Sequence, residues 1–431
     1  MTAEVTIKDG ARLEPHPLRA AVLGEVHARP FTPLQSPRRL LHFAFETTSD
    51  TAKADRAALT DFCARRGLDP LRDSAKQHRI AFGGMVLRWE QHSEFTTYTW
   101  ELSADCTPFH PPAVAVAAPM AELPQPGPVL VALDLHLVAG ALDSFERLFE
   151  RASLAVAETN DGDALFATDF QPDPAGFVRI LIIDRGMSSD HAGALAQRLT
   201  ELETYRTLAL LGLPEAQRLA PSIHRIERRL AELTEEMRRS EKLIDNNRLL
   251  DELTALAAEL EAGAVASLFR FGASRAYNEI VQMRLATIGE RPVDGFPTWS
   301  AFLARRMQPA MRTCTTTEER QANLSQKLAR AANLLRTRVD VELEQQNRDL
   351  LKSMNARTRL QLRLQTTVEG LSVAAISYYV VGLFVHVAEG AAAEGLRVDV
   401  RLATALFVPL AVVAIWWTVR RIRRRHIGAK E

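Results

Sequence analysis

Cysteine is scarce in this sequence, with three residues in a chain of 431: Cys63, Cys106 and Cys314. No two of them have the spacing of a metal knuckle or of a redox pair, so neither a disulfide framework nor a zinc site is expected. Net charge is also absent, because 53 Lys and Arg residues balance 53 Asp and Glu residues. We therefore expect no nucleic-acid partner, since proteins that bind nucleic acid carry an excess of basic residues.

The sequence motifs of common catalytic sites are absent as well. The chain contains no G-x-x-x-x-G-K-[ST] phosphate loop, no G-x-G-x-x-G dinucleotide fingerprint and no H-E-x-x-H zinc motif. It also lacks the G-x-S-x-G elbow of serine hydrolases. Cys314 has no base partner that the sequence reveals, and we expect it to be structural. These absences predict that the chain is not an enzyme and that it holds no cofactor and no metal.

Hydrophobicity is concentrated in two uncharged runs, residues 370–388 and residues 402–419, of 19 and 18 residues. At about 1.5 Å per residue each run makes a helix of roughly 28 Å, close to the thickness of a bilayer's hydrocarbon core. We expect a transmembrane hairpin over residues 366–419, with the lipid bilayer as its partner. The alternative is a pair of buried core helices in a soluble protein.

Basic residues flank the two runs on one side. They are Arg348, Lys352, Arg357, Arg359 and Arg363 before the first run, and Arg420, Arg421, Arg423, Arg424 and Arg425 after the second. The positive-inside rule then places both termini in the cytoplasm and predicts a two-span protein of the inner (plasma) membrane. The basic tail, residues 420–431, suits an anionic inner leaflet. The first 22 residues contain no apolar core of a signal peptide.

Strand-like segments dominate the N-terminal part of the chain. We predict strands over residues 40–46, 80–91, 94–102, 129–139, 154–160, 164–170 and 177–185. Helices are expected near residues 18–23, 51–66 and 140–152. This mixture predicts an α+β fold, with a cytosolic α/β domain over residues 1–187.

Helical periodicity takes over from residue 188 and predicts a helical, coiled-coil stalk over residues 188–365. One helix is expected to end at Gly212, with Pro214 as a stop signal, and Pro221 to open a long one. We further expect Pro292, Pro297 and Pro309 to mark a bend.

Two apolar seams with the spacing of a coiled coil follow Pro221. Their residues are Ile223, Ile226, Leu230, Leu233 and Met237 in the first and Asn246, Leu249, Leu253, Leu256 and Leu260 in the second. A third stripe lies on a helix expected from about residue 317 to residue 388: Leu324, Leu328, Ala331, Leu335, Val339, Leu343, Gln346, Leu350 and Met354. The seams pair either with a second copy, giving a homo-oligomer, or with each other inside one chain.

The order of these segments is similar to that of CorA-type magnesium and cobalt channels and their mitochondrial relatives. Those are pentamers whose long first membrane helix lines the pore, so the resemblance implies an oligomer and a divalent cation as partner. CorA-type channels carry a Gly-Met-Asn signature at the outer end of the first span. Here that stretch is FVHVAEG, residues 384–390, without Met-Asn. We therefore expect no conduction through that family's usual filter.

Longer motifs resemble a bacterial family of uncharacterised membrane-anchored proteins that is catalogued as a domain of unknown function. They are HARPF at 27–31, HSEFTTYTW at 92–100, ETYRTLALLGLPEA at 203–216, RTRVDVELEQQN at 336–347 and LQTTVEGLSVAAISYYVVGL at 364–383. The matches fall in all regions of the chain. This resemblance implies an inner-membrane anchor and no established activity.

One face of the first apolar run carries the candidate site residues. They are Glu369, Ser372, Ile376, Tyr379, Leu383 and His386, spaced three and four apart. Ionisable groups at membrane depth usually face protein or water, so this face is a candidate pore lining or helix interface. The alternative is that Glu369 and His386 lie at the two membrane surfaces, where long side chains reach water.

Three other groups of polar residues carry weaker hypotheses. His27 and Arg29 are candidates for contact with an anion or a partner, or they hold the N-terminal segment on the domain. Asp134 and His136 lie two apart in a predicted strand and share a face, which gives half of a metal site without further ligands. Asp161 and Asp163 predict a turn, because the EF-hand spacing is missing.

The sequence favours a membrane-anchored structural or scaffolding protein that self-associates through its helical stalk. The alternative is a CorA-like oligomeric ion channel or transporter with a non-standard filter. Subunit number distinguishes the two, because a pore built from one helix per subunit needs several subunits around an axis.

Overall fold

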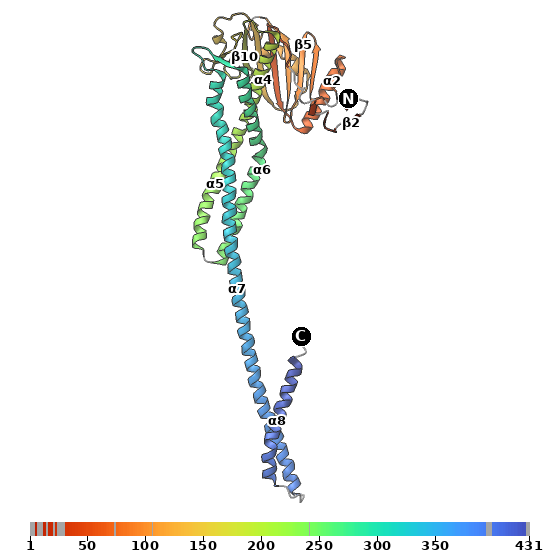
Figure 1. Cartoon of the computed structure of the whole chain (residues 1–431), viewed down its shortest axis with the longest axis vertical. Helices are drawn as coiled ribbons and strands as arrows, with labels where there is room; N and C mark the ends of the chain where they lie inside the picture. Colours follow the sequence, from red (N-terminus) through yellow and green to blue (C-terminus); the bar gives the residue numbers. More distant parts are fainter. Residues whose placement is uncertain are drawn as a thin grey trace. The chain divides into compact units, whose positions relative to one another are not determined.

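The computed structural model describes residues 5–6, 12–13, 16–19, 22–23, 31–72, 75–105, 107–240, 242–393 and 399–427 (Figure 1). The chain divides into two compact units. The first contains Met1–Arg238 and Asp251–Ala331, and the second contains Arg239–Leu250 and Ala332–Glu431. The short helix expected near residues 18–23 and the candidates His27 and Arg29 fall largely or wholly outside the described residues.

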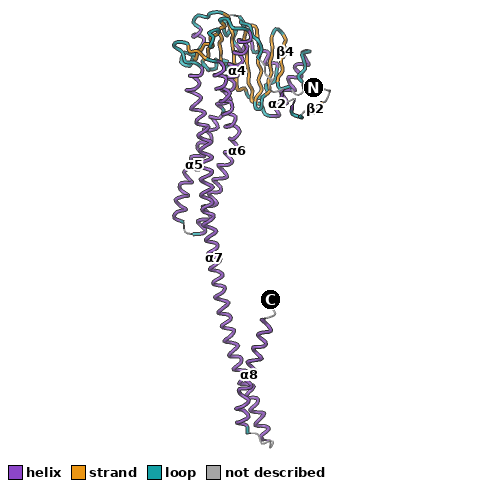
Figure 2. The backbone as a smooth tube through the Cα atoms, viewed as in Figure 1, coloured by secondary structure: helices purple, strands orange, loops and turns teal. Residues whose placement is uncertain are grey.

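A nine-stranded sheet forms the centre of the first unit (Figure 2). Its strands are β3 (Arg38–Glu46), β4 (Gln77–Phe82), β5 (Met85–Gln91), β6 (Phe95–Ser103), β7 (Val129–Ala139), β8 (Ala155–Thr159), β9 (Ala164–Thr168), β10 (Val178–Asp184) and β11 (Glu290–Pro292). They lie in the order β11-β8-β9-β10-β7-β3-β6-β5-β4, and β7–β10 is parallel while the other pairs are antiparallel. A separate ribbon pairs β1 (Val5–Thr6) with β2 (Arg12–Leu13).

Most predicted strands are confirmed, and two departures have clear causes. The run 80–91 was predicted as one strand, but Gly83 and Gly84 take φ values of 57° and 77° and turn it into the β4–β5 hairpin. Positive φ is accessible to glycine without steric cost, which makes the tight turn possible. Strand β11 was not predicted, because three residues ending in a proline carry no alternating pattern.

Helix α2 (Ser49–Arg66) confirms the prediction for residues 51–66, and Thr48 and Thr51 form a capping box at its start. The helix predicted over residues 140–152 is wrong. Only the short 3₁₀ turn η2 (Phe145–Leu148) forms there, because Gly140 and Ser144 take left-handed φ values of 90° and 60°. Helix α3 (Ala113–Val116) and the 3₁₀ helix η1 (Ala118–Glu122) lie in the β6–β7 connection.

The two faces of the sheet are buried by different elements. Alternate residues of β3 point to opposite faces, so Leu41 packs in one cluster with Phe62 of α2, and Leu40 packs in the other. The second cluster contains α4 (Ser189–Leu210), the end of α6 (Leu243–Ile288) and the start of α7 (Trp299–Ala393). Its largest side chain, Trp299, is fully buried beside Phe166. Helices therefore cover both faces of the sheet, and an apolar core lies on each side of it.

Helices α5 (Gly212–Arg239), α6 and α7 pack together within the first unit. The predicted seam residues are buried: Ile223, Ile226, Leu230 and Leu233 on α5, and Leu253, Leu256 and Leu260 on α6. Ion pairs join Arg225 to Glu259, Arg229 to Glu252 and Arg320 to Glu227. The first two pairs run in opposite chain directions, so α5 and α6 are antiparallel. Both seams thus find their partners inside one chain.

Two prolines behave differently from the prediction. Pro214 and Pro221 both lie inside α5, so Pro214 does not stop a helix and no helix starts at Pro221. The predicted bend is found where Pro292 and Pro297 lie between α6 and α7, and Pro309 lies inside α7. A proline near the first turn removes a donor that has no partner there. Pro221 is followed by the buried residues Ile223 and Ile226. Their burial outweighs the roughly 3 kcal/mol cost of an interior proline.

The second unit contains residues 239–250, the rest of α7 and helix α8 (Val400–Ile427). Asn246 is fully buried and donates from Nδ2 to the Glu342 carboxylate at 3.3 and 3.4 Å. Further along, α7 and α8 cross as an antiparallel pair (Figure 1), with the rings of Phe384 and Phe407 stacked at 3.9 Å. The chain is therefore mixed α/β, with an N-terminal sheet, a long C-terminal helix and a second apolar helix.

Candidate functional site

The C-terminal part of α7 and helix α8 expose an apolar surface. Both helices are long and apolar enough to cross a membrane, and only 6% of each apolar window is buried. Among the exposed large side chains are Leu371, Tyr378, Val387, Leu402, Leu406, Leu410 and Val413. Soluble monomers rarely expose contiguous apolar patches of more than a few hundred Å². Such a surface suits contact with lipid.

The six candidate residues of the first span lie along one face of α7. Ser372, Ile376, Tyr379, Leu383 and His386 are exposed, whereas Glu369 is half-buried. The contact with α8 uses another side of the helix, where Phe384 stacks on Phe407. The candidate face therefore points away from α8 and stays accessible in a single chain.

Ser377 is the polar residue of this hairpin that sequence reasoning missed. It is 6% exposed, and its hydroxyl has no partner among the described residues. The sequence did contain a sign of it, because Ser377 lies in the middle of the apolar run 370–388, where a hydroxyl without a hydrogen-bond partner is costly. The three- and four-residue spacing that selected Ser372 excluded it.

The two ends of the hairpin differ in charge. At the loop end, His386 Nδ1 lies 3.7 Å from a Glu389 oxygen, and Asp399 Oδ1 accepts from the backbone N–H of Arg401 at 3.1 Å. At the other end, the guanidinium of Arg420 lies 4.8 Å from the Trp416 ring and that of Arg421 lies 5.0 Å from the Trp417 ring. Tryptophan beside arginine is typical of a membrane–water boundary.

Asp134 and His136 share one face of β7, as predicted, but they do not form a metal site. Asp134 accepts two hydrogen bonds from Arg39, from Nε at 2.8 Å and from Nη2 at 2.6 Å. His136 Nδ1 accepts from the Phe109 backbone N–H at 2.7 Å, and burial lowers the His136 pKa to about 4. No group of three His, Cys, Asp or Glu residues within the described ranges is arranged to hold a metal ion.

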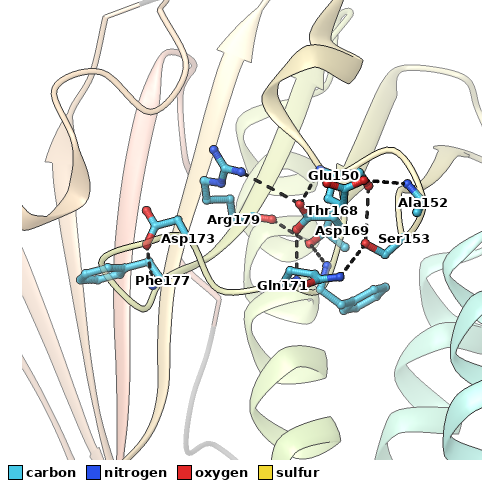
Figure 3. Close-up of polar contacts among 10 residues, drawn as sticks. Glu150, Ala152, Ser153, Thr168, Asp169, Gln171, Asp173, Phe177 and Arg179 are labelled. Atoms are coloured by element: carbon cyan, nitrogen blue, oxygen red, sulfur yellow. Dashed lines mark hydrogen bonds and ion pairs between the residues drawn. The ribbon is translucent and has the colours of Figure 1, made fainter.

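A second polar network, which the sequence analysis missed, holds the loops beside β9 and β10 (Figure 3). Asp169 accepts from the backbone N–H groups of Glu150 at 2.8 Å and Gln171 at 3.1 Å. Arg179 lies 4.0 Å from Asp169, and its guanidinium lies 5.6 Å from each of the Phe109 and Phe149 rings. Because the Asp169 carboxylate accepts hydrogen bonds from backbone N–H groups, we assign this network the role of holding the loops around Glu150 and Gln171 in place.

The predicted turn at Asp161 and Asp163 forms between β8 and β9. Asp163 also accepts from the Thr159 hydroxyl at 2.5 Å and lies 2.7 Å from His191 Nδ1. His191 is part of the first turn of α4. Among the described residues no hydroxyl or thiol contacts the His191 ring, so this pair lacks the nucleophile of a catalytic triad.

The thiols of Cys63 and Cys314 are free and buried. Burial raises the pKa of both groups, so the thiol form prevails at neutral pH. A thiol rather than a thiolate is a poor nucleophile. This environment agrees with the structural role expected for Cys314.

His42 is a buried histidine whose two ring nitrogens both have partners. Nε2 lies 3.0 Å from the Thr204 hydroxyl, which itself donates to the Thr200 carbonyl at 2.9 Å. Nε2 therefore carries the proton, and Nδ1 accepts from the Thr99 hydroxyl at 2.8 Å. Burial, with a smaller contribution from Arg88, lowers the His42 pKa from 6.5 to about 3.

Acid is expected to weaken the first unit through His42. Its native pKa is depressed, so below pH 6.5 the unfolded chain binds a proton that the native state does not. The stabilising effect of His42 is complete above pH 6.5 and falls by about 1.4 kcal/mol per pH unit as the pH drops towards its native pKa. We expect the unfolding free energy of wild type, measured relative to that of His42→Gln, to fall by about 1.4 kcal/mol for each pH unit between pH 6.5 and pH 4.5. Urea titrations at several pH values measure it, and a difference that does not vary with pH would contradict the assignment.

One family model, described as "Protein of unknown function (DUF3422)", matches residues 14–426. No curated protein and no solved structure matches the chain. The resemblance to an uncharacterised family is thus confirmed, and the similarity to CorA-type channels is not.

Proposed function

We propose, on the premise that the chain belongs to this family of unknown function, that it is a membrane-anchored scaffold. The observation that carries the proposal is the exposed apolar surface of α7 and α8. Lipid contact removes that surface from water, at about 25 cal/mol for each Å² of apolar area. In this proposal the hairpin inserts into the inner membrane, both termini stay in the cytoplasm, and the sheet-containing unit serves a structural, non-catalytic role in the cytosol.

Self-association is the second part of the proposal. The predicted stripe on α7 is buried at Leu328 and Leu335 and then becomes exposed, with Leu350 60% and Met354 57% exposed. From residue 343 to residue 368 every described side chain is exposed. Most helices in proteins depend on packing for stability, so this unpacked stretch favours a partner helix. A second copy in the same membrane offers the same stripe, in coiled-coil packing and in parallel orientation.

Membrane insertion has a direct test. We expect the full chain to stay in the membrane fraction after an alkaline carbonate wash, and a chain lacking residues 366–431 to move entirely to the supernatant. For topology, Ala393→Cys should react with a membrane-impermeant maleimide added outside intact cells, whereas Ser353→Cys should not. Wild type released by the carbonate wash would refute the anchor, and reversed labelling would refute the orientation.

A CorA-like channel remains the second candidate, because Ser372, Tyr379 and His386 are exposed on α7. Polar groups at membrane depth favour contact with protein or water over lipid, and neighbouring copies around a pore would provide both. Light scattering of the detergent complex, corrected for detergent, separates the two candidates. A pentamer with flux that Glu369→Gln changes would favour the channel, and a monomer or dimer would rule out a pore of one helix per subunit.

A further inference from the structure

The stretch of α7 from residue 350 to residue 368 is basic and apolar at once. It contains Lys352, Arg357, Arg359 and Arg363 and no acidic residue. Its large exposed hydrophobic residues are Leu350, Leu351, Met354, Leu360, Leu362, Leu364 and Val368. Glu369 separates this stretch from the first apolar run, which begins at residue 370. Such a composition is typical of helices that meet a membrane surface.

The basic residues fall on two sides of the helix. A shallow hollow of about 410 Å³, open to solvent on the surface of α7, is lined by Lys352, Asn355, Ala356, Arg359, Leu360 and Arg363, whose spacing of three and four places them on one face. We call these six residues the basic face. At 100° per residue, Leu350, Met354 and Arg357 lie on the opposite side. The apolar stripe proposed for self-association and the basic face are therefore distinct.

The two arginines of the basic face, Arg359 and Arg363, differ from their basic neighbours in their ion pairing. Nearby, Arg348 pairs with Glu344 at 2.6 Å and Lys352 with Asp349 at 3.4 Å. For Arg359 and Arg363, no described carboxylate lies within 4 Å. Guanidinium groups bind phosphate through paired hydrogen bonds, and one helical turn separates these two groups. Leu360 and Ala356 add an apolar floor to the same hollow.

The depth of Arg363 suits a lipid headgroup. It precedes residue 370 by seven positions, which is about 10 Å of helix. The headgroup layer extends about 5–8 Å beyond the hydrocarbon on each side, and an arginine side chain reaches several Å along the helix. Arg359 lies one turn further out, about 16 Å from residue 370, and contacts the headgroup only when its side chain extends along the helix towards Arg363. The stacking of Phe384 on Phe407 brings Arg420 of α8 to the level of about residue 371, at the same end of the hairpin.

We propose that the basic face of α7 binds the phosphate headgroup of an anionic phospholipid through Arg359 and Arg363. The proposal rests on the membrane insertion proposed above. A second copy is disfavoured on this face, because two parallel copies would bring the same arginines together, and like charges repel. An anionic headgroup is complementary in charge, and the apolar floor accommodates its glycerol and upper acyl chain.

The test uses the full chain in detergent and counts bound lipid by native mass spectrometry. Phosphatidylglycerol and phosphatidylcholine with identical acyl chains are titrated in parallel. We expect a preference of wild type for phosphatidylglycerol that drops about fivefold in Arg359→Gln and in Arg363→Gln and disappears in the double variant. Arg357→Gln, at the same depth but on the opposite face, is the matched control and should keep the preference within about twofold.

Three results would overturn the site. An equal drop in Arg357→Gln and Arg359→Gln would indicate diffuse attraction. Displacement of the lipid by inorganic phosphate or glycerol phosphate would assign the face to a soluble anion. If the double variant Arg359→Gln with Arg363→Gln changes the mass of the protein complex but keeps its bound lipid, the basic face is an interface between copies of the chain. The carbonate wash, run on the same variants, tests insertion separately, because loss of lipid preference in a chain that stays in the membrane leaves the anchor intact.

Discussion

Replacing Asp134 by alanine is expected to lower the free energy of unfolding of the first unit by about 3–5 kcal/mol. The Arg39 and Asp134 side chains are 3% and 1% exposed, and two hydrogen bonds join them. The alanine variant leaves the Arg39 guanidinium buried beside a single carbonyl partner, that of Pro111 at 2.6 Å. A buried charge without its counter-ion is among the most destabilising changes in a core.

Urea unfolding of the detergent-solubilised chain, followed by tryptophan fluorescence, measures this loss. Trp89, Trp100 and Trp299 are all buried in the first unit, so Trp416→Phe and Trp417→Phe make the signal specific to it. Asp61→Ala is the control, because the exposed Asp61–Arg65 pair contributes about 0–1 kcal/mol. The double variant Arg39→Met with Asp134→Leu should recover most of the loss. An equal loss in that double variant would show that packing, rather than the unpaired charge, is responsible.

Asp55→Ala is the second change with a large expected effect, a loss of about 2–5 kcal/mol. Asp55 lies on α2 and accepts from Trp89 Nε1 at 2.8 Å and from the Tyr98 hydroxyl. Trp89 and Tyr98 are fully buried, so alanine leaves two donors without partners. Asp55 itself is 3% exposed, and this burial raises the pKa of its carboxyl group.

The same urea titration tests Asp55, with asparagine as the graded comparison. Asp55→Asn keeps one oxygen as an acceptor, so we expect it to lose less than Asp55→Ala. In Asp55→Ala the emission wavelength of Trp89 should also shift, because its indole N–H loses the Asp55 oxygen that accepts its hydrogen bond. Equal losses for the two variants would mean that helix packing, and not the two hydrogen bonds, determines the effect.

The spacing of apolar residues predicted which side of each helix is buried, but it did not predict which element covers that side. The three-and-four spacing of Ile223, Ile226 and Leu230 identified the buried side of α5, yet the same spacing suits a second chain equally well. The structure resolves this choice through contacts between residues far apart in sequence, such as Arg229 with Glu252. Periodicity fixes which side of a helix is buried and contains no information on what covers it.

Buried polar groups were the hardest to predict. Asp55 bonds to residues 34 and 43 positions away, and no local signal connects them. The Asp134–His136 spacing did predict a shared strand face, because side chains alternate with period two. The spacing gave no sign of the actual partner of Asp134, which is Arg39, 95 residues earlier in the chain. The helix start predicted at Pro221 was wrong for a related reason: the cost of a proline is local, while the burial of Ile223 and Ile226 beside it comes from the whole unit.

The division of α7 between two units sets an order of events during synthesis. The first unit is complete in sequence at Ala331, and 38 residues follow before residue 370. At about 5–20 residues per second the ribosome takes roughly 2–8 s over them. The whole sequence of the first unit is therefore synthesised before the first apolar run. Until β11 is made, the β8 edge lacks its outer neighbour, and a nascent chain halted before residue 290 would expose an open strand to aggregation.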